Sequence, residues 1–228
     1  MLKSVNPANG KLLCTYPEMT IDEVDKILHM VNDAFNDWKE TTFSERAKLM
    51  LNASNVLRDQ TGELSKLMTE EMGKPIAQSR AEIEKCAWVS EYYAENAEMF
   101  LNDELIETDA AKSFVTYQPL GVVLAVMPWN FPFWQVFRFA APGLMAGNAG
   151  LLKHSSNVSG CALAIEDVFK QAGFPEHLFR TILLPSSQMD NVIKNKIIKA
   201  ITLTGSVPAG KAVAASAGSV LKKTVLEL

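Results

Sequence analysis

Three polar side chains in the second half of the chain stand where apolar stretches end, and each has a distinct chemistry. Asn130 follows the apolar run that ends at Met127. Its amide either caps the helix that follows or donates a hydrogen bond to an oxygen that becomes negative during a reaction. Lys153 ends a second apolar run, where a lysine is commonly solvated. Glu227 is either a surface group or a base whose pKa is tuned by burial.

Two further sites carry charge or free backbone groups. Arg138 lies in a strongly apolar helix and needs a partner, which is either a structural ion pair or the carboxylate of a ligand. Gly205 and Ser206 precede another helix with Pro208 in its first turn. Ser206 is therefore either a simple N-cap or part of a phosphate-binding helix N-terminus.

Composition excludes several classes of protein. The net charge of −4 and the pI near 5.5 argue against a nucleic-acid partner. The longest apolar run, residues 121–127, is too short to cross a membrane, and no secretory signal is visible at the N-terminus. The three cysteines, Cys14, Cys86 and Cys161, have no metal-ligand spacing, so we expect no metal site and a reducing, cytoplasmic location.

The first half of the chain predicts four helices. Capping boxes at Thr20 and Thr42 open the first two, the third covers residues 63–72, and a long fourth begins at Ile76. We expect residues 1–19 to form surface turns. The fourth helix has a polar face, to which we assign these residues: Glu82, Glu84, Lys85, Glu91 and Glu95.

The second half predicts alternating strands and helices. Strands are expected at 121–127, 149–153, 180–184, 198–203 and 220–226, and helices at 132–146, 158–172, 187–196 and 206–217. The nearly continuous apolar strands indicate an α/β fold, a parallel sheet with helices on both faces. Within 1–228 we distinguish a mainly helical part at 1–105, a strand or hairpin segment at 106–120 and a Rossmann-like part at 121–228.

The five residues Pro128-Trp129-Asn130-Phe131-Pro132 resemble a motif of the aldehyde dehydrogenase superfamily, and the resemblance extends over nearly the whole chain. It implies the cofactor-binding domain of that family, which fits the absence of a GxGxxG motif. In the family the motif's Asn stabilises the oxyanion. The resemblance thus implies that Asn130 is catalytic and that Met127, Pro128 and Trp129 lie along the cofactor.

The same resemblance assigns further cofactor contacts. Lys153 would bind the adenosine ribose, and Gly205 and Ser206 the pyrophosphate. Ser156 stands where many NAD-preferring members carry a Glu, so a 2′-phosphate is tolerated and NADP is favoured, with NAD also open. We expect Lys153 and His154 to add positive potential there, although His154 by itself is typical of an ordinary surface residue.

The family resemblance is strongest to succinate-semialdehyde dehydrogenases. It implies that Arg138 and Trp134 bind the semialdehyde and that Glu227 activates the hydrolytic water. None of the three cysteines occupies the family's nucleophile position, so the catalytic cysteine domain is expected to be absent and the chain alone inactive. The full-length form would be a homo-oligomer. The alternative is a truncated, non-catalytic module that binds nucleotide.

Overall fold

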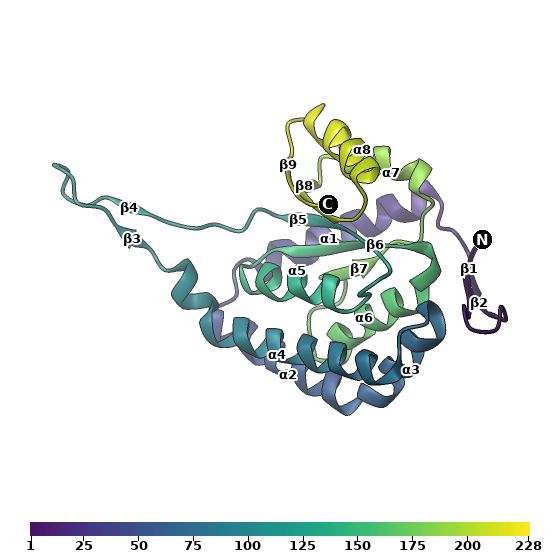
Figure 1. Ribbon diagram of the computed structural model, residues 1–228. Coiled ribbons are helices and arrows are strands. Elements are labelled where there is room, and N and C mark those ends of the chain that lie inside the picture. The colour runs from purple at the N-terminus through teal and green to yellow at the C-terminus, as the bar shows by residue number, and fades with distance from the viewer.

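The computed structural model of the protein describes residues 1–228 and contains one five-stranded sheet with strand order β7-β6-β5-β8-β9. All neighbouring strands are parallel, which confirms the predicted fold class (Figure 1). The strands are β5 (Val122–Met127), β6 (Ala149–His154), β7 (Phe179–Thr181), β8 (Ile198–Thr204) and β9 (Lys223–Glu227). The order reverses beside β5, the kind of position at which open α/β sheets bind ligands.

Helices cover both faces of this sheet. They are α5 (Trp134–Met145), α6 (Ser159–Gln171), α7 (Met189–Lys194) and α8 (Val207–Gly218). The helix α5 contacts β5 and β6, α6 contacts β6 and β7, and α8 contacts β8 and β9. Strands β5 and β6 are almost entirely buried because neither face meets water. This explains their continuous apolar sequences.

The helical first half contributes α1 (Ile21–Trp38), α2 (Phe43–Asp59), α3 (Thr61–Met72) and α4 (Ile76–Leu101). Both predicted capping boxes are present, since Thr20 and Thr42 each accept from the backbone N–H three residues later. The helix α1 contacts β5, β6 and β7, whereas α2 and α4 pack outside α5, and α2 and α3 outside α6 (Figure 1). The helical half therefore contributes layers to the same core.

Buried polar contacts join the two halves. Arg46 of α2 donates to the carbonyls of Trp38 and Met145, and the Trp38 indole donates to the Leu144 carbonyl at 3.0 Å. Glu71 of α3 accepts from the first backbone N–H groups of α6. The helical half thus supplies partners that the ends of α5 and α6 lack within their own helices.

Residues 1–19 form more than surface turns. Strands β1 (Leu2–Val5) and β2 (Leu12–Tyr16) pair antiparallel, a hairpin that the sequence prediction missed. Most residues of both strands are exposed, so no alternation of apolar side chains marks them. The last predicted strand also starts later, at Lys223, because Leu221 has a left-handed backbone conformation that ends the preceding turn.

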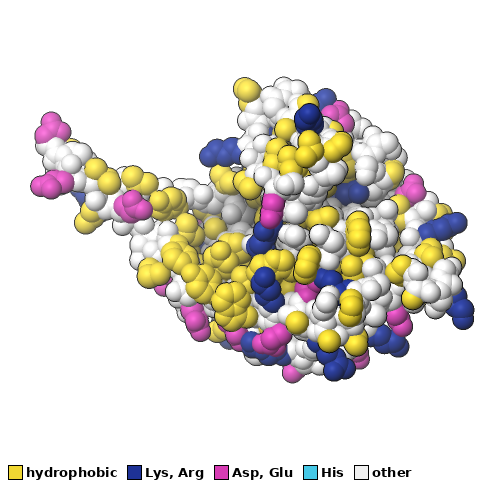
Figure 2. Space-filling model, viewed as in Figure 1, with side chains coloured by type: hydrophobic (Ala, Val, Ile, Leu, Met, Phe, Trp, Pro, Cys, Tyr) yellow, Lys and Arg dark blue, Asp and Glu magenta, His cyan; other side chains and the backbone are white.

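A hairpin arm leaves the body between α4 and β5. Its paired residues are β3 (Glu104–Leu105) and β4 (Phe114–Val115), and the arm projects far from the sheet (Figure 1). Hydrophobic side chains gather near the base of the arm (Figure 2). No helix in the protein combines the length and the apolar character that crossing a membrane requires.

Candidate active site

The carboxyl ends of four strands bring most of the predicted site residues to one edge of the sheet. Met127 ends β5, Lys153 is the penultimate residue of β6, and Glu227 ends β9. The register pairs Met127 with His154 and Thr204 with Glu227. Because parallel strands end at the same edge, side chains from distant parts of the sequence meet there.

Asn130 lies in the turn between β5 and α5. Its side chain is exposed and forms no hydrogen bond within the protein, and neighbouring Trp129 is 50% exposed. The N-cap of α5 is Phe133, with no hydrogen bond from a capping side chain of its own. The capping alternative for Asn130 is therefore wrong, and its amide is free to bind a ligand.

A carboxylate from the other half of the chain caps α5 instead. Glu82 Oε1 accepts from the backbone N–H groups of Phe133 and Trp134 at 2.9 and 3.0 Å. Glu82 is buried and forms an ion pair with Lys74, which is also buried. Its assignment to the solvated face of the fourth helix is wrong because the packing of α4 against α5 covers that position.

A pattern in the sequence of α4 could have revealed Glu82. Most buried positions of this helix recur at spacings of three and one, on the face that packs inward: Ser79, Glu82, Ile83, Cys86, Ala87 and Ser90, with Val89 and Ala97 buried in addition. A glutamate within such a stripe is costly to bury without a partner. A glutamate at a buried position of α4 was therefore the signal that Glu82 has a specific partner.

His154 is a buried connection between β6 and the Asn130 turn. Its Nδ1 accepts from the Ser155 N–H at 2.9 Å, so Nε2 carries the proton and donates to the Pro132 carbonyl at 2.9 Å. Burial lowers the pKa of His154 to about 4. The expectations of a surface position and of added positive potential are both wrong, since the imidazole is 5% exposed and neutral at pH 7.

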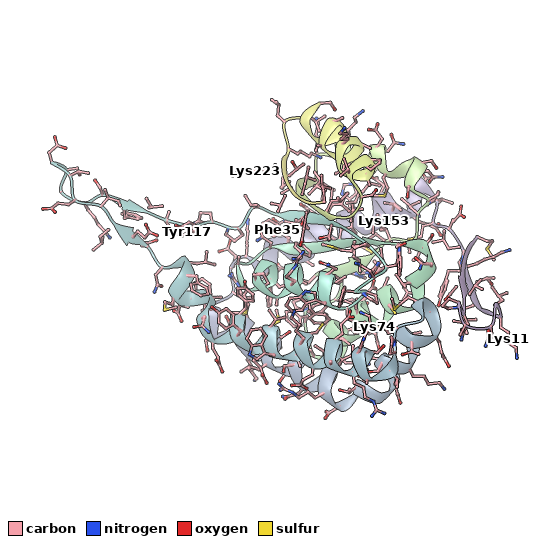
Figure 3. All side chains as sticks on the ribbon, viewed as in Figure 1. Lys11, Phe35, Lys74, Tyr117, Lys153 and Lys223 are labelled. Carbon is pink, nitrogen blue, oxygen red and sulfur yellow. The ribbon has the colours of Figure 1, made fainter.

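Lys153, labelled in Figure 3, lines a cavity of about 260 Å³ at the carboxyl ends of β5, β6 and β8. The side chain is buried, so the solvated alternative is wrong, and burial lowers the pKa of its amino group. The only hydrogen bond of that group is a long one, 3.4 Å to Ser186 Oγ. An ammonium group has three donors, so two of them remain available to a ligand in this cavity.

The Gly205-Ser206 turn and Ser156 have different local roles. Ser206 is the N-cap of α8 and accepts from Ala209 N at 3.4 Å, which confirms the capping assignment. The Gly205 N–H is already used, since it donates to the Glu227 carbonyl at 3.0 Å. Ser156 is exposed at the start of the short 3₁₀ turn Ser156–Val158. Contact of these residues with a cofactor stays a prediction.

Arg138 and Glu227 form an ion pair across the edge of the sheet. Nη1 of Arg138 donates to Glu227 Oε1 at 2.9 Å, and Nη2 bonds the second carboxylate oxygen. Nη2 also donates to Thr204 Oγ1 at 3.2 Å. The pair borders an open cavity of about 490 Å³ together with Met127. Arg138 therefore has the ionic partner that its apolar helix required.

Trp134 lines a different recess, one of about 300 Å³ between α4 and the turn. Phe131 and Lys85 share this recess, and the Lys85 amino group lies 3.8 Å from the centre of the Trp134 ring. Trp134 and Arg138 are four residues apart on α5, yet they border separate hollows. Binding of one substrate by both residues stays a prediction.

The three cysteines differ in exposure. Cys14 is exposed in β2, whereas Cys86 and Cys161 are buried inside α4 and α6. Burial raises the pKa of the Cys86 and Cys161 thiols well above the ordinary value. A protonated, enclosed thiol is a poor nucleophile, so neither buried cysteine is suited to covalent catalysis.

Comparison with known proteins identifies the relatives of this chain. A model of the aldehyde dehydrogenase family matches residues 1–228. A probable NADP⁺-dependent succinate-semialdehyde dehydrogenase of Synechocystis is 49% identical over the whole chain and 50% of its own length. The NADP⁺-dependent succinate-semialdehyde dehydrogenase 1 of Mycobacterium tuberculosis is 47% identical, also over the whole chain and 50% of its length. The chain thus spans about half the length of these relatives.

Solved structures agree with this result. The crystal structure of succinic semialdehyde dehydrogenase from Streptococcus pyogenes with NADP⁺ superposes with a TM-score of 0.97 at 32% identity. That match covers 100% of this chain and 50% of the crystallised one. An NADP-dependent enzyme of E. coli superposes with a TM-score of 0.95, also at 32% identity, over the whole chain and 48% of that protein.

Proposed function

This chain belongs to the aldehyde dehydrogenase family, and on that basis we propose that it is the cofactor-binding part of an NADP-dependent enzyme that oxidises succinate semialdehyde to succinate. In this proposal residues 1–228 form one cofactor-binding unit. It consists of a mainly helical part at 1–105, a strand or hairpin segment at 106–120 and a Rossmann-like part at 121–228. The names of its relatives support both the substrate and the cofactor.

One observation carries the catalytic assignment. The Asn130 amide is exposed and unpaired, while Glu82 caps the helix that Asn130 would otherwise cap. When a nucleophile attacks an aldehyde, the carbonyl oxygen becomes negative. A fixed amide N–H directed at that oxygen stabilises the transition state more than the substrate, which accelerates the reaction. Asn130 is therefore assigned as the oxyanion donor.

The cofactor fits the residues around Lys153. The buried ammonium group has two unused donors in a cavity whose other walls are mostly apolar. Ribose hydroxyl groups or a 2′-phosphate would satisfy those donors, and the exposed Ser156 hydroxyl carries no negative charge. The carboxylate that lines the cavity, Asp190, is paired with Lys194. Met127, Pro128, Trp129, Gly205 and Ser206 would hold the rest of the dinucleotide. When bound, NADP⁺ accepts the hydride that leaves the substrate.

The Arg138–Glu227 pair suggests how the substrate carboxylate is recognised. A guanidinium binds carboxylates in a bidentate manner, and Glu227 occupies that position in this structure. The carboxylate of a semialdehyde would take its place, with Trp134 along the aliphatic chain. The released Glu227 would then be free to accept a proton from the hydrolytic water.

The nucleophile is not among the residues at this edge of the sheet. The buried thiols of Cys86 and Cys161 are protonated and enclosed, and Cys14 lies in β2. We therefore expect the thiolate to come from outside residues 1–228, and we expect this segment alone to bind cofactor without turnover. The alternative function is nucleotide binding without catalysis, by the same module.

Exposed apolar side chains support assembly of the full-length form into a homo-oligomer. They lie on the arm and on the adjoining end of α4, near the region where Figure 2 shows hydrophobic atoms gathered. Contiguous apolar surface of this kind marks contact sites between proteins. The residues are Met99, Phe100, Leu105, Ile106, Phe114, Val115 and Tyr117.

The test is succinate-semialdehyde-dependent formation of NADPH by the full-length protein that contains this segment, followed at 340 nm. Asn130→Ala should lower kcat by about a hundredfold, the usual loss for one oxyanion donor. Arg138→Met should raise KM for succinate semialdehyde and leave butanal, which has no carboxylate, nearly unaffected. Wild-type kcat in Asn130→Ala, or equal effects of Arg138→Met on both aldehydes, would contradict the assignments.

A further inference from the structure

The turn that carries Asn130 is held by residues of the helical half. Glu82 of α4 binds the backbone N–H groups of Phe133 and Trp134, three and four residues after Asn130. The Glu82 side chain is 2% exposed, and α5 has no other side chain at its N-cap. The start of α5 therefore depends on a residue about fifty positions earlier in the sequence.

Lys74 contacts the same turn from a second direction. It is labelled in Figure 3 and lies between α3 and α4, in the loop that begins at Gly73. It forms an ion pair with Glu82. Its amino group is 3.6 Å from the centre of the Phe131 ring, the residue directly after Asn130. The Lys74–Glu82 pair thus touches Phe131, Phe133 and Trp134.

Stability alone is a weak reason for such a pair. Removing two charges from water costs free energy that their mutual attraction often fails to return, and apolar replacements of similar volume are commonly neutral or stabilising. The hydrogen bonds and the ring contact all converge on the turn. The geometry therefore points to a role in fixing its conformation.

We propose that Lys74 and Glu82 are positioning residues for Asn130, holding its turn in the one conformation that directs the amide toward the reacting oxygen. This inference rests on the proposed role of Asn130 as an oxyanion donor. Because the Asn130 side chain has no protein partner, its direction is set by the backbone on which it stands. A loosened turn would therefore misplace the donor without removing it.

The chain offers a matched control. Glu71 is also buried, also comes from the helical half, and also caps a helix of the sheet layer. Its two carboxylate oxygens accept from the backbone N–H groups of Gly160 and Cys161 at 2.9 and 2.8 Å. Those contacts lie at the start of α6. Loss of the Glu71 cap should destabilise the fold to a similar degree without loosening the Asn130 turn.

The test compares variants of Lys74, Glu82 and Glu71 by hydrogen–deuterium exchange. Lys74→Met with Glu82→Leu removes both charges and the cap, whereas Lys74→Met with Glu82→Gln keeps an oxygen acceptor. We expect amide exchange at residues 131–137 to accelerate about tenfold in the first and to be restored only in part in the second, because the cap returns without the Lys74 contact to Phe131. Glu71→Leu should accelerate exchange at the start of α6 instead. Glu82→Asp, which keeps the charge but shortens the reach, provides a second loosening variant if the first does not fold.

The same variants in the full-length enzyme separate positioning from folding. The loosened variants should lower kcat about tenfold with KM for NADP⁺ unchanged, the Gln variant should restore kcat in part, and Glu71→Leu should retain it. Unchanged exchange at 131–137 after loss of Glu82 would overturn the inference, and so would loosening without any change in kcat. The exchange experiment requires no turnover, so an inactive wild-type enzyme would refute the proposed function independently.

Discussion

The buried His154 predicts a specific loss of stability in mild acid. Its pKa is about 4 in the folded protein and 6.5 when unperturbed. Between these values the unfolded chain binds a proton that the folded protein does not, so stability is fully present above pH 6.5 and falls as the pH drops toward 4. With 1.36 kcal/mol per pKa unit, the loss between pH 7 and pH 5 is about 2 kcal/mol from this residue alone.

A comparison with His154→Gln isolates that contribution. Glutamine can still donate to the Pro132 carbonyl but does not titrate. Urea unfolding at pH 7 and pH 5, followed by tryptophan fluorescence, gives the free energy of unfolding of both proteins. The Gln variant should gain about 2 kcal/mol relative to the wild type on going from pH 7 to pH 5. His29→Gln, at an exposed histidine of α1, is the control for loss of an imidazole.

Two results would refute this reasoning. The first is a free-energy difference between wild type and His154→Gln that does not change from pH 7 to pH 5. The second is an imidazole NMR titration of His154 in the folded protein with a midpoint near 6.5, which would mean that the ring is solvated. Either result would remove His154 as the neutral link between β6 and the Asn130 turn.

Further substitutions test buried hydrogen bonds, a helix cap and core packing by urea denaturation. Arg46→Met leaves buried carbonyl groups unpaired and should lower the free energy of unfolding by about 3 kcal/mol. A loss below about 1 kcal/mol would show that the hydrogen bonds of Arg46 contribute little to stability. Thr20→Ala removes one capping box and should cost about 1 kcal/mol, with an unchanged midpoint as the contrary result. Phe169→Ala removes a ring packed against Phe137 and Phe179 and should lower the free energy of unfolding by about 3–5 kcal/mol. A much smaller loss would mean that the core collapses into the vacated space.

The sequence predicts most of the fold because its strongest signals are local. The capping boxes at Thr20 and Thr42 place the first two helices to within about a residue. The apolar runs ending at Met127 and Lys153 place the central strands because both are buried on two faces. The hairpin of β1 and β2 escapes such patterns because its strands are largely exposed.

The residues of the candidate site also differ in whether local sequence predicts them. The motif around Asn130 and the position of Lys153 are readable from nearby residues. By contrast, the cap from Glu82, the ion pair between Arg138 and Glu227 and the burial of His154 all depend on contacts between distant segments. Residue type and spacing do not predict that the Arg138 guanidinium pairs with the Glu227 carboxylate. Glu82 is the exception, since it lies beside Ile83 and between buried positions of α4 and could have been recognised from that position.

The central claim, that the cavity around Lys153 binds the dinucleotide, is tested most directly by calorimetric titration of NADP⁺ into the purified 228-residue chain. Lys199→Met serves as the control because Lys199 is exposed at the opposite edge of the same sheet. We predict that the wild type and Lys199→Met bind NADP⁺ equally and that Lys153→Met binds at least about tenfold more weakly. Equal binding by Lys153→Met, or no heat from the folded wild type at millimolar NADP⁺, would contradict the claim.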